Sequence, residues 1–184
     1  LLMMAWKIAP ALAMGNCVVI KPAETTSITA LKFGEILQEA GLPPGVLNIV
    51  TSSDHAVGAL LAEDPRVDMV SFTGSTATGR AVMAAGAATI KKVFLELGGK
   101  SAFLVLEDAD LAAACSMAGF TAAVHAGQGC AITTRLVVPR ARYDEAVAAA
   151  AATMGRIRPG DPADAGTVCG PVISGRQRDR VQAY

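Results

Sequence analysis

The sequence predicts an α/β protein built around a parallel sheet. Three strands are predicted, at residues 17–20, 46–50 and 67–72, and the first is a continuous apolar run typical of a strand buried on both faces of such a sheet. Stretches with the period of amphipathic helices separate these strands. Strand and helix that alternate at βαβ spacing are typical of a parallel sheet with helices on both faces.

Each element of the first half has its own signal. A helix over residues 1–14 places Met4, Ile8 and Leu12 on one stripe and ends at Gly15. A second helix, over residues 25–40, begins at hydroxyl residues that can cap it and ends at Gly41. Helices are also predicted over residues 55–62 and from the turn at 73–79 to residue 88, with a fourth strand at 93–95.

The second half repeats the pattern after Gly98 and Gly99. Strands are predicted at residues 102–106 and 135–138, helices at 110–126 and 143–156, and a polar connection at 160–171. Two adjacent glycines let a chain change direction, so we predict two domains, at residues 1–97 and 98–184. The chain starts in mid-pattern without methionine and ends inside a polar, helix-like run, which predicts a fragment of a longer protein.

Composition excludes several partners. The 184 residues have zero formal net charge and no basic patch, so nucleic acid and anionic membranes are not expected. The uncharged run at 111–134 holds glycines, His125 and Gln128, and we interpret it as a buried helix and loop rather than a membrane span.

The cysteines form no metal-binding pattern. They show no CxxC, and the chain has only two histidines, so no metal site is predicted. Unpatterned cysteines are typical of reduced thiols, and we expect a cytoplasmic protein. Free cysteines are usually small buried residues, which fits Cys17 in a strand and Cys115 on a helix but leaves Cys169 undecided.

Two segments at strand ends are candidate ligand sites. Ser75, between Gly74 and Gly79, stands where a strand turns into a helix whose first N–H groups can bind an anion, although for this segment alone a simple capped turn is the preferred interpretation. Lys21 and Glu24 follow another strand and could hold ribose hydroxyls, the alternative being a solvated lysine and a capping glutamate. Neither GxGxxG nor a Walker lysine is present.

Glu96 and Cys130 are the candidate base and nucleophile. Glu96 lies in an apolar, strand-like run, and a carboxylate that water reaches poorly is suited to general base catalysis; a glutamate facing outward at a strand end is the alternative. Cys130 follows a glycine-rich loop, where small neighbours let a substrate approach and the backbone N–H can bind an oxyanion. The competing interpretation is a buried structural cysteine.

Taken in order, these segments resemble the NAD(P)-dependent aldehyde dehydrogenase superfamily. The resemblance spans essentially the whole chain, and the ordered set of segments is highly specific although each is weak alone. It implies a Rossmann-like parallel-sheet cofactor domain at residues 1–97, followed by part of an α/β catalytic domain at 98–184. The segments are Met3-Met4-Ala5-Trp6-Lys7, Gly15-Asn16, Lys21-Pro22-Ala23-Glu24, Gly41-Leu42-Pro43-Pro44-Gly45-Val46, Phe72-Thr73-Gly74-Ser75, Glu96-Leu97-Gly98-Gly99-Lys100-Ser101, Gly127-Gln128-Gly129-Cys130 and Gly170-Pro171.

The resemblance implies an oxidoreductase that converts an aldehyde into a carboxylic acid with NAD(P). Cys130 would add to the aldehyde carbonyl, giving a thiohemiacetal and then a thioester, and Glu96 would activate the hydrolytic water. Lys7 corresponds to a proton-relay lysine of some members. The substrate pocket would be lined by Met3, Trp6 and Val124.

The resemblance also assigns the cofactor site. Lys21 and Glu24 would hold the adenosine ribose, and Ser75 would lie near the pyrophosphate. A carboxylate at Glu24 would repel a 2′-phosphate, so NAD is expected, with NADP as the alternative. The cofactor-binding residues implied are Lys21, Glu24, Gly74, Ser75, Gly79 and Leu97.

Parts of the family's site lie outside this sequence. The oxyanion asparagine belongs to a motif before Leu1, and a Glu-Xaa-Phe-Gly-Pro segment that touches the nicotinamide ribose comes later. The chain is therefore expected to be inactive alone, and the full-length protein is expected to form a homodimer or homotetramer.

Three other functions stay open at this point. A CoA-acylating dehydrogenase passes the acyl group to CoA, but that subgroup tends to lack a carboxylate at the position of Glu96. A non-catalytic structural or binding relative on the same fold would not need both Glu96 and Cys130. A cysteine hydrolase would need a histidine such as His125, but no orienting Asn or Asp is identifiable.

Overall fold

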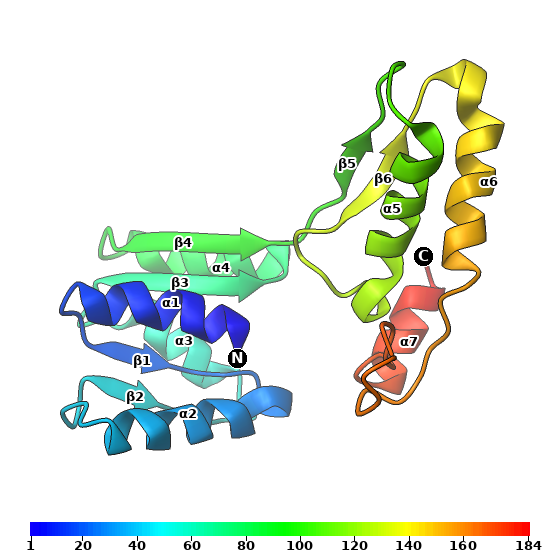
Figure 1. Cartoon of the computed structure of the whole chain (residues 1–184). Coiled ribbons are helices and arrows are strands. Elements are labelled where there is room, and N and C mark those ends of the chain that lie inside the picture. The colour runs from blue at the N-terminus through cyan, green and yellow to red at the C-terminus, as the bar shows by residue number, and fades with distance from the viewer. The chain divides into compact units, whose positions relative to one another are not determined.

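The chain folds as two compact units, Leu1–Leu97 and Gly98–Tyr184, in a computed structural model that describes residues 1–184. Each unit combines parallel strands with helices, so the predicted α/β class is confirmed (Figure 1).

Four strands form two parallel pairs in the first unit. β1 (Val18–Ile20) pairs with β2 (Leu47–Ile49), and β3 (Met69–Gly74) pairs with β4 (Lys92–Leu97). No hydrogen bonds join β1 to β3, so the single continuous sheet that the alternation predicted is replaced by two short ones. Val19 is 47% exposed, which makes the prediction of a strand buried on both faces wrong for β1.

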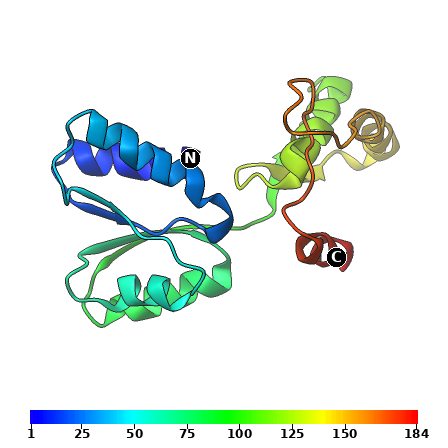
Figure 2. The same ribbon diagram turned by 90° about the horizontal axis from the view of Figure 1, so that it is seen from below.

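Helices cover the strands of the first unit from both sides. α1 (Leu2–Ala13) and α2 (Ser27–Glu39) lie on one face, and α3 (Ala56–Glu63) and α4 (Thr76–Ala87) lie on the other (Figure 2). Ile8, Ala30 and Ala62 are the buried residues of α1, α2 and α3, whereas Ile28 and Ile36, predicted to face the core from α2, are exposed. β3 has the predicted length but lies two residues later in the chain, and β4 is longer than predicted, so Glu96 lies inside a strand.

The second unit packs two helices against one parallel pair. β5 (Ser101–Leu104) pairs with β6 (Thr133–Val137), and α5 (Leu111–Ala123) and α6 (Tyr143–Met154) pack against each other. Val105, Leu111, Cys115 and Ala146 form its core. A Cβ on Gly119 would lie 2.8 Å from the Ala150 carbonyl oxygen, so the two helix backbones approach closely there.

The remaining elements are short. α7 (Gly175–Gln182) begins where Ser174 accepts a hydrogen bond from the Gln177 N–H at 3.2 Å. Single 3-10 turns span Glu24–Thr26 and Arg140–Arg142, and a turn with left-handed residues spans Val124–Gly127. None of the helices combines the length and the apolar character needed to cross a bilayer.

Candidate active site

The carboxyl edge of the first unit collects the residues predicted there. Its four strands run in one direction, and the amino end of α1 lies at the edge where they end (Figure 1). Lys21 directly follows β1, Gly74 ends β3 and Leu97 ends β4. This is the edge at which open α/β sheets generally bind ligands.

Lys21 and Glu24 stand on the turn after β1. The half-buried Lys21 donates from Nζ to the Pro22 carbonyl at 3.2 Å, and the exposed Glu24 opens the turn Glu24–Thr26. Neither side chain forms an ion pair. The ammonium can therefore donate to a ligand, and the carboxylate can accept from one.

Ser75 is the N-cap of α4, which agrees with its interpretation as part of a simple capped turn. Its Oγ accepts from the Thr78 N–H at 3.2 Å and lies 2.9 Å from Thr78 Oγ1. The first turn of this helix carries no acidic residue, so its amino end keeps the charge that suits an anion.

Two glycines predicted to bind the cofactor, Gly74 and Gly79, lie against neighbouring side chains that leave little room for a Cβ. A Cβ on Gly79, which is buried in α4, would lie 2.6 Å from Leu97 Cδ2, and one on Gly74 would lie 2.5 Å from Phe72 Cζ. Gly79 thus lets α4 approach β4 and is part of a helix rather than of the preceding turn. Its contact with a cofactor stays a prediction.

Glu96 is exposed within its unit, contrary to the expectation of a poorly solvated carboxylate. Val93 and Leu97 face α4, where they come close to the positions of Gly86 and Gly79, so the alternation of β4 directs Glu96 to the opposite face. β4 pairs on one side only, and that face is incompletely covered in this unit.

Lys7 lies within electrostatic reach of Glu96. Burial lowers the pKa of the half-buried Lys7, and the negative charge of Glu96 raises it again in part. Lys7 shares α1 with the two predicted pocket residues, the half-buried Met3 and the largely exposed Trp6. Val124 belongs to the second unit, where it begins the turn Val124–Gly127.

Cys130 is exposed in the loop before β6. Thr133 pairs with Ser101, so the loop lies at the amino ends of both strands of the second unit. A Cβ on Gly129 would lie 2.6 Å from Ile132 Cγ2, which explains why a glycine precedes the cysteine. The exposed thiol does not fit the alternative of a buried structural cysteine.

Sequence reasoning missed the turn that precedes this loop. The helix predicted to residue 126 ends at Ala123, and His125 (φ 52°, ψ 32°) and Ala126 (φ 54°, ψ 34°) adopt left-handed conformations. Such a conformation costs an L-residue about 1–2 kcal/mol. The glycine at position 127 was the one local sequence signal for a left-handed turn, and Gly127 does adopt φ 71°.

The burial of the other three cysteines agrees only in part with the prediction. Cys115 is fully buried, as predicted, and burial raises the pKa of its thiol. Cys17 is exposed, so its interpretation as a buried strand residue is wrong: β1 begins one residue later, at Val18. Cys169 is half-buried.

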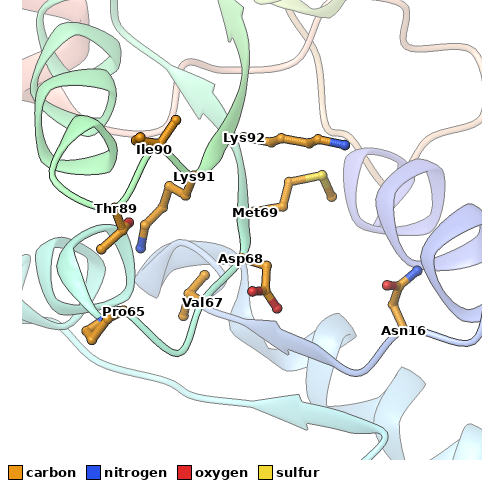
Figure 3. Close-up of a pocket in the computed structure, with 9 residues that line it drawn as sticks. All are labelled: Asn16, Pro65, Val67, Asp68, Met69, Thr89, Ile90, Lys91 and Lys92. Atoms are coloured by element: carbon orange, nitrogen blue, oxygen red, sulfur yellow. The ribbon is translucent and has the colours of Figure 1, made fainter.

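An open hollow lies away from the predicted site. It encloses about 460 Å³ and is found where β3 and β4 begin, at the edge opposite to Ser75 and Glu96 (Figure 3). Its lining residues are Asn16, Pro65, Val67, Asp68, Met69, Thr89, Ile90, Lys91 and Lys92. None of the predicted site residues lines it.

Comparison with known proteins identifies the class of protein that this fold and site define. The profile of the aldehyde dehydrogenase family matches residues 1–184. The chain is also 47% identical, over all its 184 residues, to the chloroplastic betaine aldehyde dehydrogenase of Beta vulgaris. The chain therefore belongs to the aldehyde dehydrogenase family.

Solved structures agree with this assignment. Aldehyde dehydrogenase C of Pseudomonas syringae, a mutant complexed with NAD+ and octanal, is 45% identical, with a TM-score of 0.91 over 96% of this chain and 36% of that one. The aldehyde dehydrogenase of Mycobacterium tuberculosis, complexed with NAD+, is 47% identical, with a TM-score of 0.91 over 97% of this chain and 37% of that one. The chain covers 37% of the Beta vulgaris protein, so it spans little more than a third of these relatives.

Proposed function

We propose that the full-length protein carrying this chain oxidises an aldehyde to a carboxylic acid with NAD+, and that Cys130 is its nucleophile. The observation that carries the proposal is the exposed Cys130 thiol in a glycine-bracketed loop of an aldehyde dehydrogenase family member. The NAD+ and octanal bound by the Pseudomonas syringae relative support the same reaction class.

The carboxyl edge of the first unit fits NAD+. Lys21 can donate to ribose hydroxyls and Glu24 can accept from them, while the carboxylate of Glu24 repels the 2′-phosphate of NADP. The amino end of α4, capped by Ser75, suits the pyrophosphate. Bound NAD+ supplies the acceptor for the hydride.

Cys130, Glu96 and Lys7 carry out the other steps of the proposed reaction. The Cys130 thiolate forms a C–S bond to the aldehyde carbon, and its backbone N–H stabilises the oxyanion of the thiohemiacetal. Loss of hydride leaves a thioester on Cys130. Glu96 then takes a proton from water, whose oxygen attacks the thioester, and the carboxylic acid departs with the thiolate restored. Lys7, coupled to Glu96 by charge, can pass that proton on.

A cysteine substitution tests the proposal. Cys130→Ala in the full-length protein should lower aldehyde-dependent NADH formation by at least about 10³-fold. Cys17→Ala, which removes another exposed thiol, should leave the rate unchanged. A panel of aldehydes with NAD+ and NADP+ defines the substrate and cofactor preference. NADH formation that survives in Cys130→Ala would sink the nucleophile assignment.

We further propose that the full-length protein is a cytoplasmic homodimer or homotetramer. Ile28 and Ile36 on α2 are 81% and 49% exposed, so this helix offers apolar side chains that another subunit, or another segment of the full-length protein, can bury. Light scattering coupled to gel filtration measures the assembly. A monomer at micromolar concentration would contradict it.

A further inference from the structure

The backbone strain of the second unit is concentrated just before Cys130. His125, Ala126 and Gly127 occupy the left-handed region in succession, with φ of 52°, 54° and 71°. Glycine adopts this region freely and histidine is among the residues enriched there, whereas alanine has neither advantage. The cost of the turn therefore falls mainly on Ala126, four positions before Cys130.

Hydrogen bonds hold the turn in this conformation. The His125 N–H donates to the Val168 carbonyl at 3.0 Å, and the Gln128 N–H and Nε2 both donate to the His125 carbonyl, at 3.1 and 3.2 Å. Val168 is itself fixed, because its neighbour Cys169 accepts from the Gly160 N–H at 3.0 Å. The left-handed turn is thus tied to a distant segment of the same unit.

The helix before the turn, α5, is held in place by its packing in the core of the second unit. Leu111 and Cys115 on α5 are buried in the core, and Gly119 lets α5 approach the backbone of α6. With α5 fixed, the dihedral angles of the turn set the direction in which the Cys130 loop leaves the helix.

We propose that Ala126 is a positioning residue for Cys130: its left-handed conformation, locked to Val168, holds the cysteine loop in the arrangement that the reaction requires. This inference rests on the proposed function. Strained residues persist where the surrounding structure over-determines them, and they cluster at active sites. A misplacement of about 1 Å can cost a reaction about 10²-fold.

Substitutions at residue 126 separate a positioning role from a purely structural one. Ala126→Val places a β-branched residue where left-handed φ is strongly disfavoured, so the turn should relax and kcat should fall about 10-fold or more. The Kd for NAD+ should not change, because the proposed cofactor residues lie in the first unit. Ala126→Asn, which tolerates this region, should keep kcat within about 2-fold.

A matched control uses the end of α5. Ala123→Val adds the same two methyl groups at a residue with right-handed angles (φ −101°, ψ −21°) and should leave kcat per folded molecule unchanged. If Ala126→Val does not fold, Gly127→Ala tests the positioning role instead. It places an L-residue at φ 71° and should lower kcat about 3-fold. Gly175→Ala, which meets no atom within 4 Å, is its control.

The outcomes separate this inference from the proposed function. If Ala126→Val or, failing that, Gly127→Ala lowers only the Tm and keeps kcat per folded molecule, the turn is structural and the positioning role is overturned. If Cys130→Ala retains NADH formation, the proposed function itself fails. A fall in kcat in Ala126→Val at unchanged NAD+ affinity, together with a nearly unchanged kcat in Ala126→Asn, supports both the positioning role and the proposed function.

Discussion

Lys7 and Glu96 are coupled by charge although they lie on different elements, α1 and β4. Burial is the larger influence on Lys7 and lowers its pKa, and the Glu96 carboxylate opposes this shift. The proton affinity of the lysine therefore depends on the charge of the candidate base.

Neutralising Glu96 should lower the pKa of Lys7 further. In Glu96→Gln the opposing negative charge is lost while the burial remains, so the ammonium is stabilised less. NMR titration of reductively ¹³C-methylated lysines measures the change in the 184-residue chain. Glu107→Gln, which removes an exposed carboxylate of the other unit, is the control. A Lys7 titration that does not move in Glu96→Gln would contradict the coupling.

The same lysine should make stability depend on alkaline pH. Its folded pKa lies below its unfolded pKa, so between these values the unfolded state binds more protons and stability rises with pH. Below the folded pKa the contribution is constant and unfavourable. Lys7→Met should therefore stabilise the first unit near neutral pH and flatten the rise that the wild type shows toward the ordinary lysine pKa.

Urea unfolding at a series of pH values from 7 upward measures this difference. Lys32→Met is the matched control, because the exposed Lys32 ammonium pairs with Glu35 at 2.7 Å on a helix surface. Parallel stability profiles for the wild type and Lys7→Met would show that Lys7 does not titrate differently in the folded state.

Removing the Glu96 carboxylate should slow deacylation in the full-length protein. An amide cannot take a proton from water, so steady-state turnover should fall about 10²-fold, a typical contribution of a general base. Stopped-flow measurement should still show one rapid burst of NADH per Cys130, because acyl-enzyme formation precedes the step that Glu96 serves. Unchanged turnover with deacylation rate-limiting would exclude Glu96 as the base.

The sequence predicted the α/β class because periodicity records which side chains face a core. It could not predict that β1 and β3 share no hydrogen bonds, because strand partners leave no trace in the period of a single strand. The apolar run continues past Ala123, so the left-handed angles of His125 and Ala126 were hidden within an apparently helical pattern. The exposure of Glu96 depends on its place on an edge strand, which is a tertiary property.

Ile90 offers a test of backbone strain far from the candidate site. It turns the chain between α4 and β4 with φ 54°, although it is β-branched, and its side chain is 91% exposed. Replacing it removes the steric cost of the left-handed region and sacrifices almost no packing. Ile90→Gly should therefore stabilise the first unit by about 1 kcal/mol, after the larger unfolded-state entropy of glycine is subtracted.

The control for Ile90 is the same substitution in a helix. Ile28, also largely exposed, lies in the first turn of α2, where Ile28→Gly should destabilise the unit by up to about 0.5 kcal/mol because glycine is a poorer helix former than isoleucine. Urea denaturation of the three proteins compares their free energies of unfolding. Opposite signs for the two substitutions identify strain at residue 90, whereas equal losses would mean that the isoleucine makes contacts that outweigh its unfavourable backbone.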